Sequence, residues 1–333
     1  MPNSLSAPPA AGRWHRPLLW FAAAMGVLTL VALAGLIVDD RTIGGSPAWL
    51  KPFKFAVSLG VYAVTLAWLL RFAKRARRTG WWAATVVAAA SAGEMVAIVL
   101  QAARGRASHF NHATPFDETV WSLMGTTVVV LWTASLVVAV VVAIQRDADP
   151  VVRSAARLGF ALSLAGMLLG FLMTAPTAAQ RAELGRGGSP AMLGAHSVGV
   201  ADGGPSMPVT GWSTTGGDLR IPHFTGIHAL QALPLLALLL AMLAARYPAR
   251  FGAVRTRVRL VRVAAAGYAG LLALLTWQAL RGQPLLEPDA ATLAGAGVLV
   301  ALTAALTAAV LQSRGSGLSQ ARIAVSSSSV NGI

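Results

Sequence analysis

The chain has 333 residues, of which 56% are hydrophobic and 12% are charged, and its mean hydropathy is +0.63. Soluble domains carry about 25% charged residues, so this composition excludes an ordinary soluble domain and indicates an integral membrane protein. The formal net charge of +15 does not indicate a nucleic-acid partner, because the basic residues lie in short stretches between apolar segments.

Eight apolar segments are each long enough to cross a bilayer, which takes about 20 helical residues. Backbone polar groups must find partners within such a segment, so we predict an all-α membrane protein, a bundle of eight transmembrane helices. The predicted limits are 17–38, 53–72, 81–103, 118–144, 155–175, 222–245, 258–280 and 290–312. They form one domain, 17–312, between disordered tails at 1–16 and 313–333.

The basic residues predict the orientation of the bundle. If the N-terminus is cytoplasmic, 18 of the 27 Lys and Arg residues fall on the cytoplasmic side, so both termini are expected there. The first segment has the basic start of a signal peptide, but its apolar run continues through Val38. That length favours a retained helix over a cleaved one.

The second segment carries a polar stripe. Lys54, Ser58, Tyr62 and Thr65 are spaced 4, 4 and 3 residues apart, so they share one face of a helix. Lys54 and Tyr62 are therefore candidates for substrate binding, although snorkelling to the headgroups explains Lys54 equally well. For Lys51, snorkelling is the preferred interpretation.

The third segment places a carboxyl group near the middle of the span. Helical spacing puts Ser91, Glu94, Ile98 and Gln101 on one face, with Arg104 one turn further along. Ionisable groups within a membrane usually serve function, so Glu94 is interpreted as an acid/base or proton-coupling group. The alternative is a neutral glutamic acid that bonds two helices together. Gln101 and Arg104 are candidates for substrate binding.

A long loop at 176–221 precedes the sixth segment and is predicted to act as a lid, because loops of this length are usually functional or disordered. Pro222 is expected to open the following helix. His223 and His228 are five residues apart and point about 140° apart on a helix, which argues against an HExxH-type metal pair. His228 and Gln231 do share a face.

Five of the six histidines fall toward the outer side: His109, His112, His196, His223 and His228. Because the chain has no cysteine, a metal site would have to use nitrogen and oxygen ligands from several elements. The predicted metal ligands are His109, His196, His223 and His228, with a divalent metal or haem as cofactor. The alternative is that each histidine is an ordinary hydrogen-bonded residue at the membrane interface.

The stretches QAARGRASHFN and TGGDLRIPHFTGIHALQ resemble those of an uncharacterised group of bacterial multi-pass membrane proteins. The resemblance covers most of the second to sixth segments. It implies a location in the bacterial inner membrane, and it brings no activity, substrate or cofactor.

We therefore predict an outward-facing pocket of His, Glu and Lys between the second, third, fourth and sixth helices. The leading hypothesis is a metal- or haem-dependent membrane enzyme for a hydrophobic or lipid-like substrate, with Glu94, His228 and Asp202 as catalytic groups. Arg220 and Gln231 join the substrate-binding candidates. The alternatives are a proton-coupled transporter or sensor that uses Glu94, and a structural subunit of a membrane complex. The expected partners are membrane lipids, a hydrophobic small molecule and a second copy of the chain, with no nucleic acid.

Overall fold

The computed structural model describes residues 14–313, so most of both predicted tails lies outside the described residues. Within this range the chain is helical, and eight helices are long and apolar enough to cross a membrane. They are α1 (Arg16–Val38), α2 (Leu50–Leu70), α3 (Arg77–Ala103), α4 (Pro115–Ala143), α5 (Pro150–Leu169) with the 3-10 turn η1 (Gly170–Thr174), α8 (Ala229–Arg246), α10 (Val254–Leu280) and α11 (Ala290–Gln312). The predicted all-α fold with eight apolar helices is confirmed, whereas its orientation stays a prediction.

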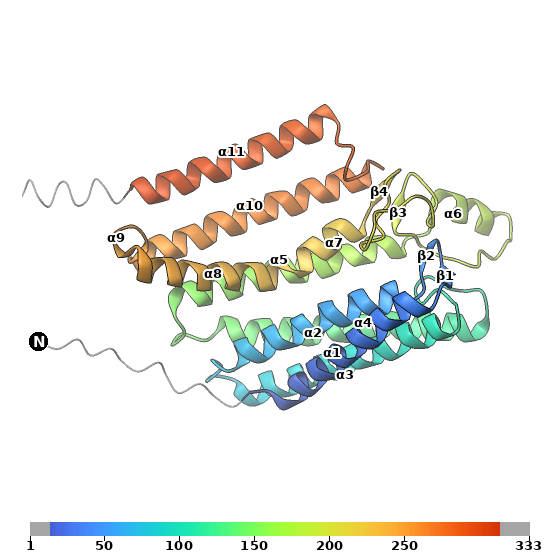
Figure 1. Cartoon of the computed structure of the whole chain (residues 1–333), viewed down its shortest axis with the longest axis horizontal. Coiled ribbons are helices and arrows are strands. Elements are labelled where there is room, and N and C mark those ends of the chain that lie inside the picture. Colours follow the sequence, from blue (N-terminus) through green and yellow to red (C-terminus); the bar gives the residue numbers. More distant parts are fainter. Residues whose placement is uncertain (1–13, 314–333) are drawn as a thin grey trace, which may run out of the picture.

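The remaining elements are short. Three are helices: α6 (Ala178–Gly185), α7 (Arg220–Ile227) and α9 (Pro248–Phe251). Two antiparallel strand pairs complete the set: β1 (Thr42–Ile43) with β2 (Ser46–Pro47), and β3 (Ser197–Val198) with β4 (Gly217–Asp218). Both pairs and α6 lie at the end of the bundle that carries the 176–221 loop, which we call the loop end (Figure 1). We call the opposite end the arginine end.

Helix starts follow from capping chemistry. The Thr114 side chain accepts a hydrogen bond from the Asp117 amide, and Pro115 occupies the first helical position of α4. Asp289 accepts from the Thr292 amide in the same way, which begins α11 at the predicted residue. Helix α2 begins at Leu50, three residues before the predicted limit, so it includes Lys51.

The sixth predicted segment is two helices rather than one. Helix α7 ends at Ile227 and α8 begins at Ala229, with His228 between them. Side chains of neighbouring helices donate hydrogen bonds to two of the backbone carbonyl groups at this break. The Ser163 hydroxyl of α5 donates to the Ile227 carbonyl at 3.0 Å, and the Tyr268 hydroxyl of α10 donates to the Thr225 carbonyl at 2.6 Å. Side chains from α5 and α10 thus stabilise the interruption.

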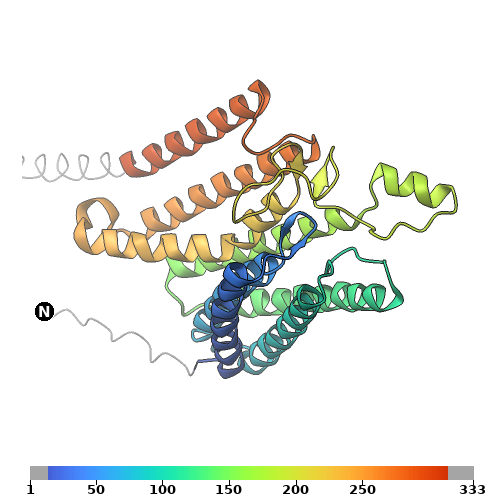
Figure 2. The ribbon, with the colours of Figure 1, turned by 45° about the vertical axis from the view of Figure 1, so that its right-hand side comes forward.

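The helices form two groups (Figures 1 and 2). Helices α1–α4 pack on one another, and α5, α7, α8, α10 and α11 form the second group. The seam between the groups is made by α4 against α5 and by a smaller contact of α2 with α8. Within the second group, α5 and α7 touch backbone to backbone, because a Cβ atom on Gly166 would collide with Gly226.

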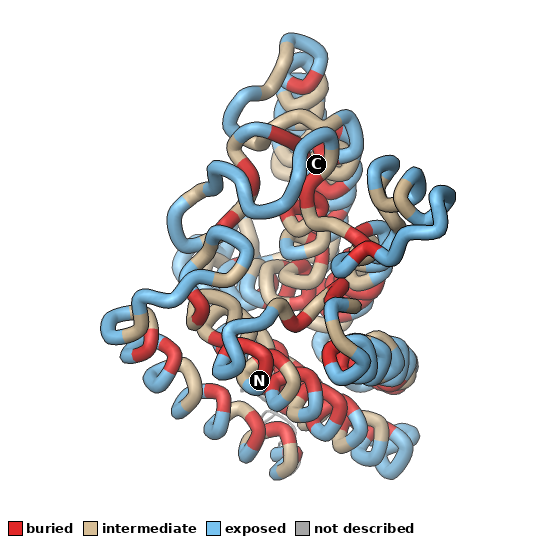
Figure 3. The backbone as a smooth tube through the Cα atoms, turned by 90° about the vertical axis from the view of Figure 1, so that its right-hand side faces the viewer, coloured by how far each residue is buried: buried red, intermediate tan, exposed pale blue. Residues whose placement is uncertain are grey.

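Figure 3 looks onto the loop end, where exposed loops lie over buried helix ends. A small apolar cluster of Phe110, Met173, Leu219 and Ala279 fixes these loops to the helices. The long loop is therefore anchored to the bundle through Leu219, and its role as a lid stays a prediction.

Candidate functional site

The loop end gathers charged and imidazole side chains from α2, the α3–α4 loop, the long loop and α7. We call this set the loop-end cluster: Lys51, Lys54, His109, His196, Asp202, Arg220, His223 and His228. Helix α2 supplies the two lysines in its first two turns, α7 supplies Arg220 and His223, and His228 follows the last residue of α7. His109, His196 and Asp202 come from the loops of the same end.

The Lys51 ammonium lies against an imidazole. Its Nζ is 3.1 Å from His109 Nδ1, and the Ser108 hydroxyl is also 3.1 Å from that nitrogen. Burial, followed by the positive charge of Lys51, holds the pKa of His109 well below its usual value. His109 is therefore neutral and accepts a hydrogen bond from the ammonium through Nδ1. Lys51 has no carboxylate within ion-pair distance among the described residues.

Lys54 is held by the long loop. Its Nζ donates to the Thr210 carbonyl at 2.6 Å. The loop presents this carbonyl through a strained turn, because Val209 has a φ of 65°, a conformation that β-branched residues rarely adopt. The Thr210 hydroxyl is buried without a hydrogen-bond partner. Lys54, like Lys51, thus contacts a neutral acceptor rather than a carboxylate.

Arg220 is matched by an acid. Its guanidinium donates to both oxygens of Asp218, at 2.9 and 2.5 Å, and to the Gly211 carbonyl at 2.5 Å. Asp218 is fully buried and also accepts the Ser213 amide at 2.8 Å. These contacts tie the loop to the start of α7. Arg220 thus has a structural partner, and its role in substrate binding stays a prediction.

His196 and Asp202 form a pair within the long loop. His196 Nδ1 is 2.9 Å from the Asp202 carboxylate, which also accepts the His196 amide at 2.9 Å and the Ser197 amide at 2.8 Å. Burial raises the pKa of Asp202, but the hydrogen bond and charge of His196 outweigh it and lower the pKa overall. Burial lowers the pKa of His196 against the opposing effect of Asp202. Asp202, expected as a catalytic group, accepts three bonds that shape the loop.

His228 lies at the break between α7 and α8 and reaches across the seam. Its Nδ1 is 3.2 Å from Gln231 Oε1, and its Nε2 is 3.3 Å from the Ser58 hydroxyl of α2. The predicted shared face of His228 and Gln231 is confirmed. His223 instead contacts the Gly166 carbonyl of α5 through Nδ1, at 2.8 Å, so the two histidines serve different contacts.

Glu94 is buried in α3, with 5% of its surface exposed. Its Oε1 has no hydrogen-bond partner, and neither has the hydroxyl of Ser91 one turn away. The charged side chain that acts on Glu94 electrostatically is Lys51, although the two form no direct ion pair. An ionised carboxylate is costly to bury without donors, so this site favours the neutral acid until a cation or donor approaches.

The predicted polar face of α3 is buried as expected, but its outer part is a closed network. Gln101 Nε2 donates to Asp117 at 2.9 Å, and Arg104 donates to the same Asp117 oxygen at 2.7 Å and to Gln101 Oε1 at 2.5 Å. The Thr114 hydroxyl donates to the other Asp117 oxygen at 2.8 Å. Gln101 and Arg104, expected to bind substrate, hold α3 to α4 here.

The polar stripe of α2 divides along its length. Lys54 and Ser58 contact the loop and His228, whereas the Tyr62 hydroxyl donates to Ser135 of α4 at 2.7 Å. The Thr65 hydroxyl bonds to its own helix. Tyr62, a substrate-binding candidate, thus joins α2 to α4 below the cluster.

The structure does not support the predicted metal site. Among residues 14–313 no group of three or more His, Asp or Glu side chains is placed to hold a metal ion. The physical reason is that the four predicted ligands have separate partners: Lys51 for His109, Asp202 for His196, Gly166 for His223, and Ser58 with Gln231 for His228. These histidines are close enough to influence one another electrostatically, but their nitrogen atoms do not converge on one metal position.

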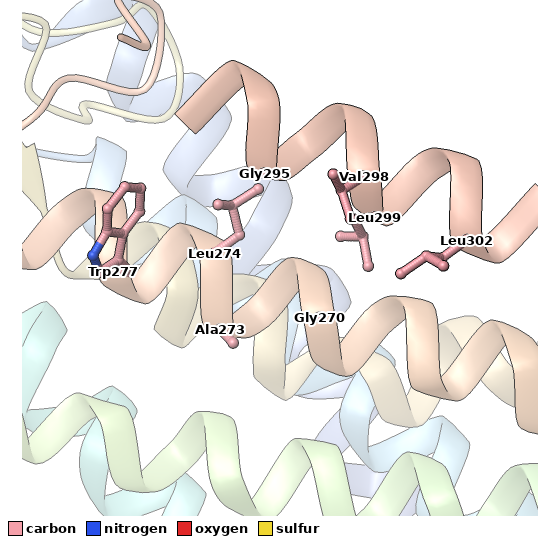
Figure 4. A pocket seen from close by; sticks show the side chains of 8 residues that line it. All are labelled: Gly270, Ala273, Leu274, Trp277, Gly295, Val298, Leu299 and Leu302. Atoms are coloured by element: carbon pink, nitrogen blue, oxygen red, sulfur yellow. The ribbon is translucent and has the colours of Figure 1, made fainter. Parts of the chain in front are cut away.

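A groove lies elsewhere, between α10 and α11 (Figure 4). Its lining is apolar, with Trp277 at one end and Leu302 at the other, and Gly270 and Gly295 where the helices approach. Helix α11 buries little beyond Thr292. The groove therefore offers no charged or imidazole group and is separate from the loop-end cluster.

Sequence reasoning missed Lys51 and Thr210. Lys51 was interpreted as a snorkelling residue. It contacts His109, and it is the charged group that acts electrostatically on Glu94. A usable signal existed, since only three lysines occur in the chain and two of them share one helical turn. Thr210 had no such signal, because its contact with Lys54 spans 156 residues.

Comparison with known proteins adds no assignment: no protein-family model, no curated protein and no solved structure matches this chain.

Proposed function

We propose that this protein is a proton-coupled transporter of the membrane, in which Glu94 carries the coupling proton. The observation that carries the proposal is the state of Glu94, a buried carboxyl whose Oε1 lacks a partner. Such a group in a span exchanges a proton when its surroundings change, which is how carboxyl groups couple proton and solute movement.

Two features of the fold support transport over a purely structural role. The helices form two groups, which meet where α4 packs on α5 and where α2 contacts α8. Relative motion of two helix groups is one way in which transporters alternate access to a site. The second group also contains an interrupted helix, α7–α8, whose break at His228 faces Ser58 across that seam. Interrupted helices at such interfaces are typical of solute sites in transporters.

The arrangement of charge supports an outward-facing loop end. The basic residues between α2 and α3, α4 and α5, and α8 and α10 all lie at the arginine end, which is the expected cytoplasmic side. The loop-end cluster would then face out of the cytoplasm. For the metal-dependent enzyme expected from the sequence, no group of three or more metal-ligating side chains occurs among the described residues.

The test uses the absence of cysteine in the chain, which lets two spin labels be placed without background. Labels at Val57→Cys on α2 and Leu235→Cys on α8 report across the seam, because both positions are exposed. We expect their distance distribution to change with external pH, and Glu94→Gln to abolish the change.

A pair within one group, Val57→Cys and Val96→Cys, is the control and should not respond. A wild-type distribution independent of pH, or an unaltered response in Glu94→Gln, would contradict the proposal. A response to pH with no solute movement in liposomes would instead indicate a sensor.

A further inference from the structure

We propose that Lys51 and Lys54 form a binding site for a small anion, a carboxylate or phosphate, and that the turn at 207–211 closes over this site. The inference rests on the proposed transport function and names the class of solute. It starts from the two ammonium groups, which lie one turn apart at the beginning of α2.

The two ammonium groups have spare hydrogen-bond capacity. Each carries three donors. Among the described residues, Lys51 contacts one imidazole nitrogen and lies 5.9 Å from the centre of the Phe55 ring, and Lys54 contacts one backbone carbonyl. Both acceptors are neutral. Hydrogen bonds from an ammonium to an anionic oxygen are shorter and about twice as strong, so an anion would displace the carbonyl from Lys54.

The charges around the lysines are unbalanced. Arg220 and Lys54 repel Lys51, whereas Glu94 and Asp202 attract it more weakly. The nearby acids are already engaged, since Asp218 binds Arg220 and Asp202 binds the 196–197 backbone. When Glu94 is protonated, the Lys51 and Lys54 charges have no free counter-ion within the part of the chain described. This positive excess in a half-buried place attracts an anion.

The turn at 207–211 covers Lys54, and it is anchored at Gly211 and strained at Val209. Three backbone hydrogen bonds close it: from the Gly211 amide to Met207, from the Met207 amide to Trp212 and from the Thr210 amide to Pro208. The Arg220 guanidinium also donates to the Gly211 carbonyl. Its strained residue, Val209, is 67% exposed and packs little. The buried Thr210 hydroxyl has no partner within the structure, so it is available to donate to an anion beside Lys54.

Protonation of Glu94 and anion binding should reinforce each other. The Glu94 carboxylate competes with an incoming anion for the field of Lys51. Neutralising that carboxylate leaves Lys51 to the anion, and a bound anion in turn favours the protonated acid. By linkage the two effects have equal size.

The experiment measures binding of inorganic phosphate and of acetate to the full chain in uncharged lipid nanodiscs at constant ionic strength. Tryptophan fluorescence reports binding, because Trp212 lies beside the turn and Trp49 precedes α2. We expect saturable binding of at least one of the two anions. Lys54→Gln should raise the dissociation constant at least about tenfold, since it removes a charge-assisted hydrogen bond.

The matched control is Lys74→Gln. Lys74 is the third lysine, lies at the arginine end and pairs with Asp147 on the surface, so its loss should leave binding unchanged. Lys54→Arg keeps the charge and guards against a folding defect, and should retain most of the affinity. Nanodiscs that contain phosphatidylglycerol distinguish the sources: loss of phosphate binding there would identify a lipid headgroup as the occupant.

The inference is overturned if neither anion binds in either kind of nanodisc, or if Lys54→Gln and Lys74→Gln bind alike. In that event, a pH-dependent distance between the spin labels on α2 and α8 would still support the proposed transport function. Conversely, binding without any seam response would retain the anion site and remove the transport proposal.

Discussion

Two cationic sites at the loop end differ in how their charge is matched. Arg104 meets the buried Asp117 directly, within a network that also includes Gln101 and Thr114. Among residues 14–313, Lys51 and Lys54 meet an imidazole nitrogen, an aromatic ring and a carbonyl oxygen, and neither forms an ion pair. A cation that already pairs with a buried carboxylate holds the fold together and cannot also bind a ligand. A cation without a carboxylate partner remains available to a ligand. All three residues are cations, so residue type alone does not distinguish them. The presence or absence of a carboxylate partner separates the structural candidate from the functional ones.

The largest expected effect is on the matched site. Asp117→Asn leaves Arg104 and the surrounding donors without their anion, so the free energy of unfolding should fall by about 2–3 kcal/mol. Thermal unfolding in detergent measures it. Asp147→Asn is the control, because Asp147 is 68% exposed in its pair with Lys74, and it should cost at most about 0.5 kcal/mol. Equal losses from both variants would contradict the comparison.

A direct contrast comes from neutralising one cation at each site. Arg104→Gln should lower the free energy of unfolding by about 1–2 kcal/mol, because it strands the buried Asp117. Lys54→Gln should change it by less than about 0.5 kcal/mol, since it removes a cation that has no counter-charge. Denaturation curves of the two variants, recorded under the same conditions, measure both changes in the free energy of unfolding. A larger loss for Lys54→Gln would show that its contact with Thr210 is structural.

The pH dependence should reveal the neutral histidines of the cluster. Burial lowers the pKa of His109 and of His196, so the unfolded chain binds these protons more readily than the folded chain. The free energy of unfolding should therefore fall as the pH drops below about 6.5, by up to about 1.4 kcal/mol per pH unit for each histidine. His109→Gln should reduce that slope in a stability titration, and an unchanged slope would assign the effect elsewhere.

The smallest effect concerns the turn that covers Lys54. Val209→Gly removes the steric penalty of a φ of 65° and loses little packing, so stability should rise by about 1 kcal/mol. Val209→Ala keeps the penalty and should show no gain. If both variants destabilise the protein equally, the turn is held by its side chain rather than strained by its backbone.

The parts of the molecule that depend on local pattern were predictable. The limits of α11 were predicted to the residue, and the buried face of Ser91, Glu94 and Gln101 followed from helical spacing alone. The shared face of His228 and Gln231 was likewise predictable, because three residues on a helix bring side chains together. Each of these depends on residues within a few positions of one another.

The parts that depend on the path of the loops were not predictable. The helix break at His228 is stabilised by Ser163 and Tyr268 from distant segments. The contact between Lys54 and Thr210 requires the long loop to return over α2. For the same reason the histidines were predicted to share a metal, although the fold gives each its own partner. Nearness at one end of a bundle does not fix which side chains meet.

The central claim, that anion binding at the lysines is coupled to protonation of Glu94, is tested most directly by counting protons. Calorimetric titration of phosphate or acetate in two buffers of different ionisation enthalpy gives the number of protons taken up on binding. We expect an uptake approaching about one proton per anion in the wild-type chain and none in Glu94→Gln. Binding with no proton uptake in the wild-type chain at any pH, or with equal uptake in Glu94→Gln, would contradict it.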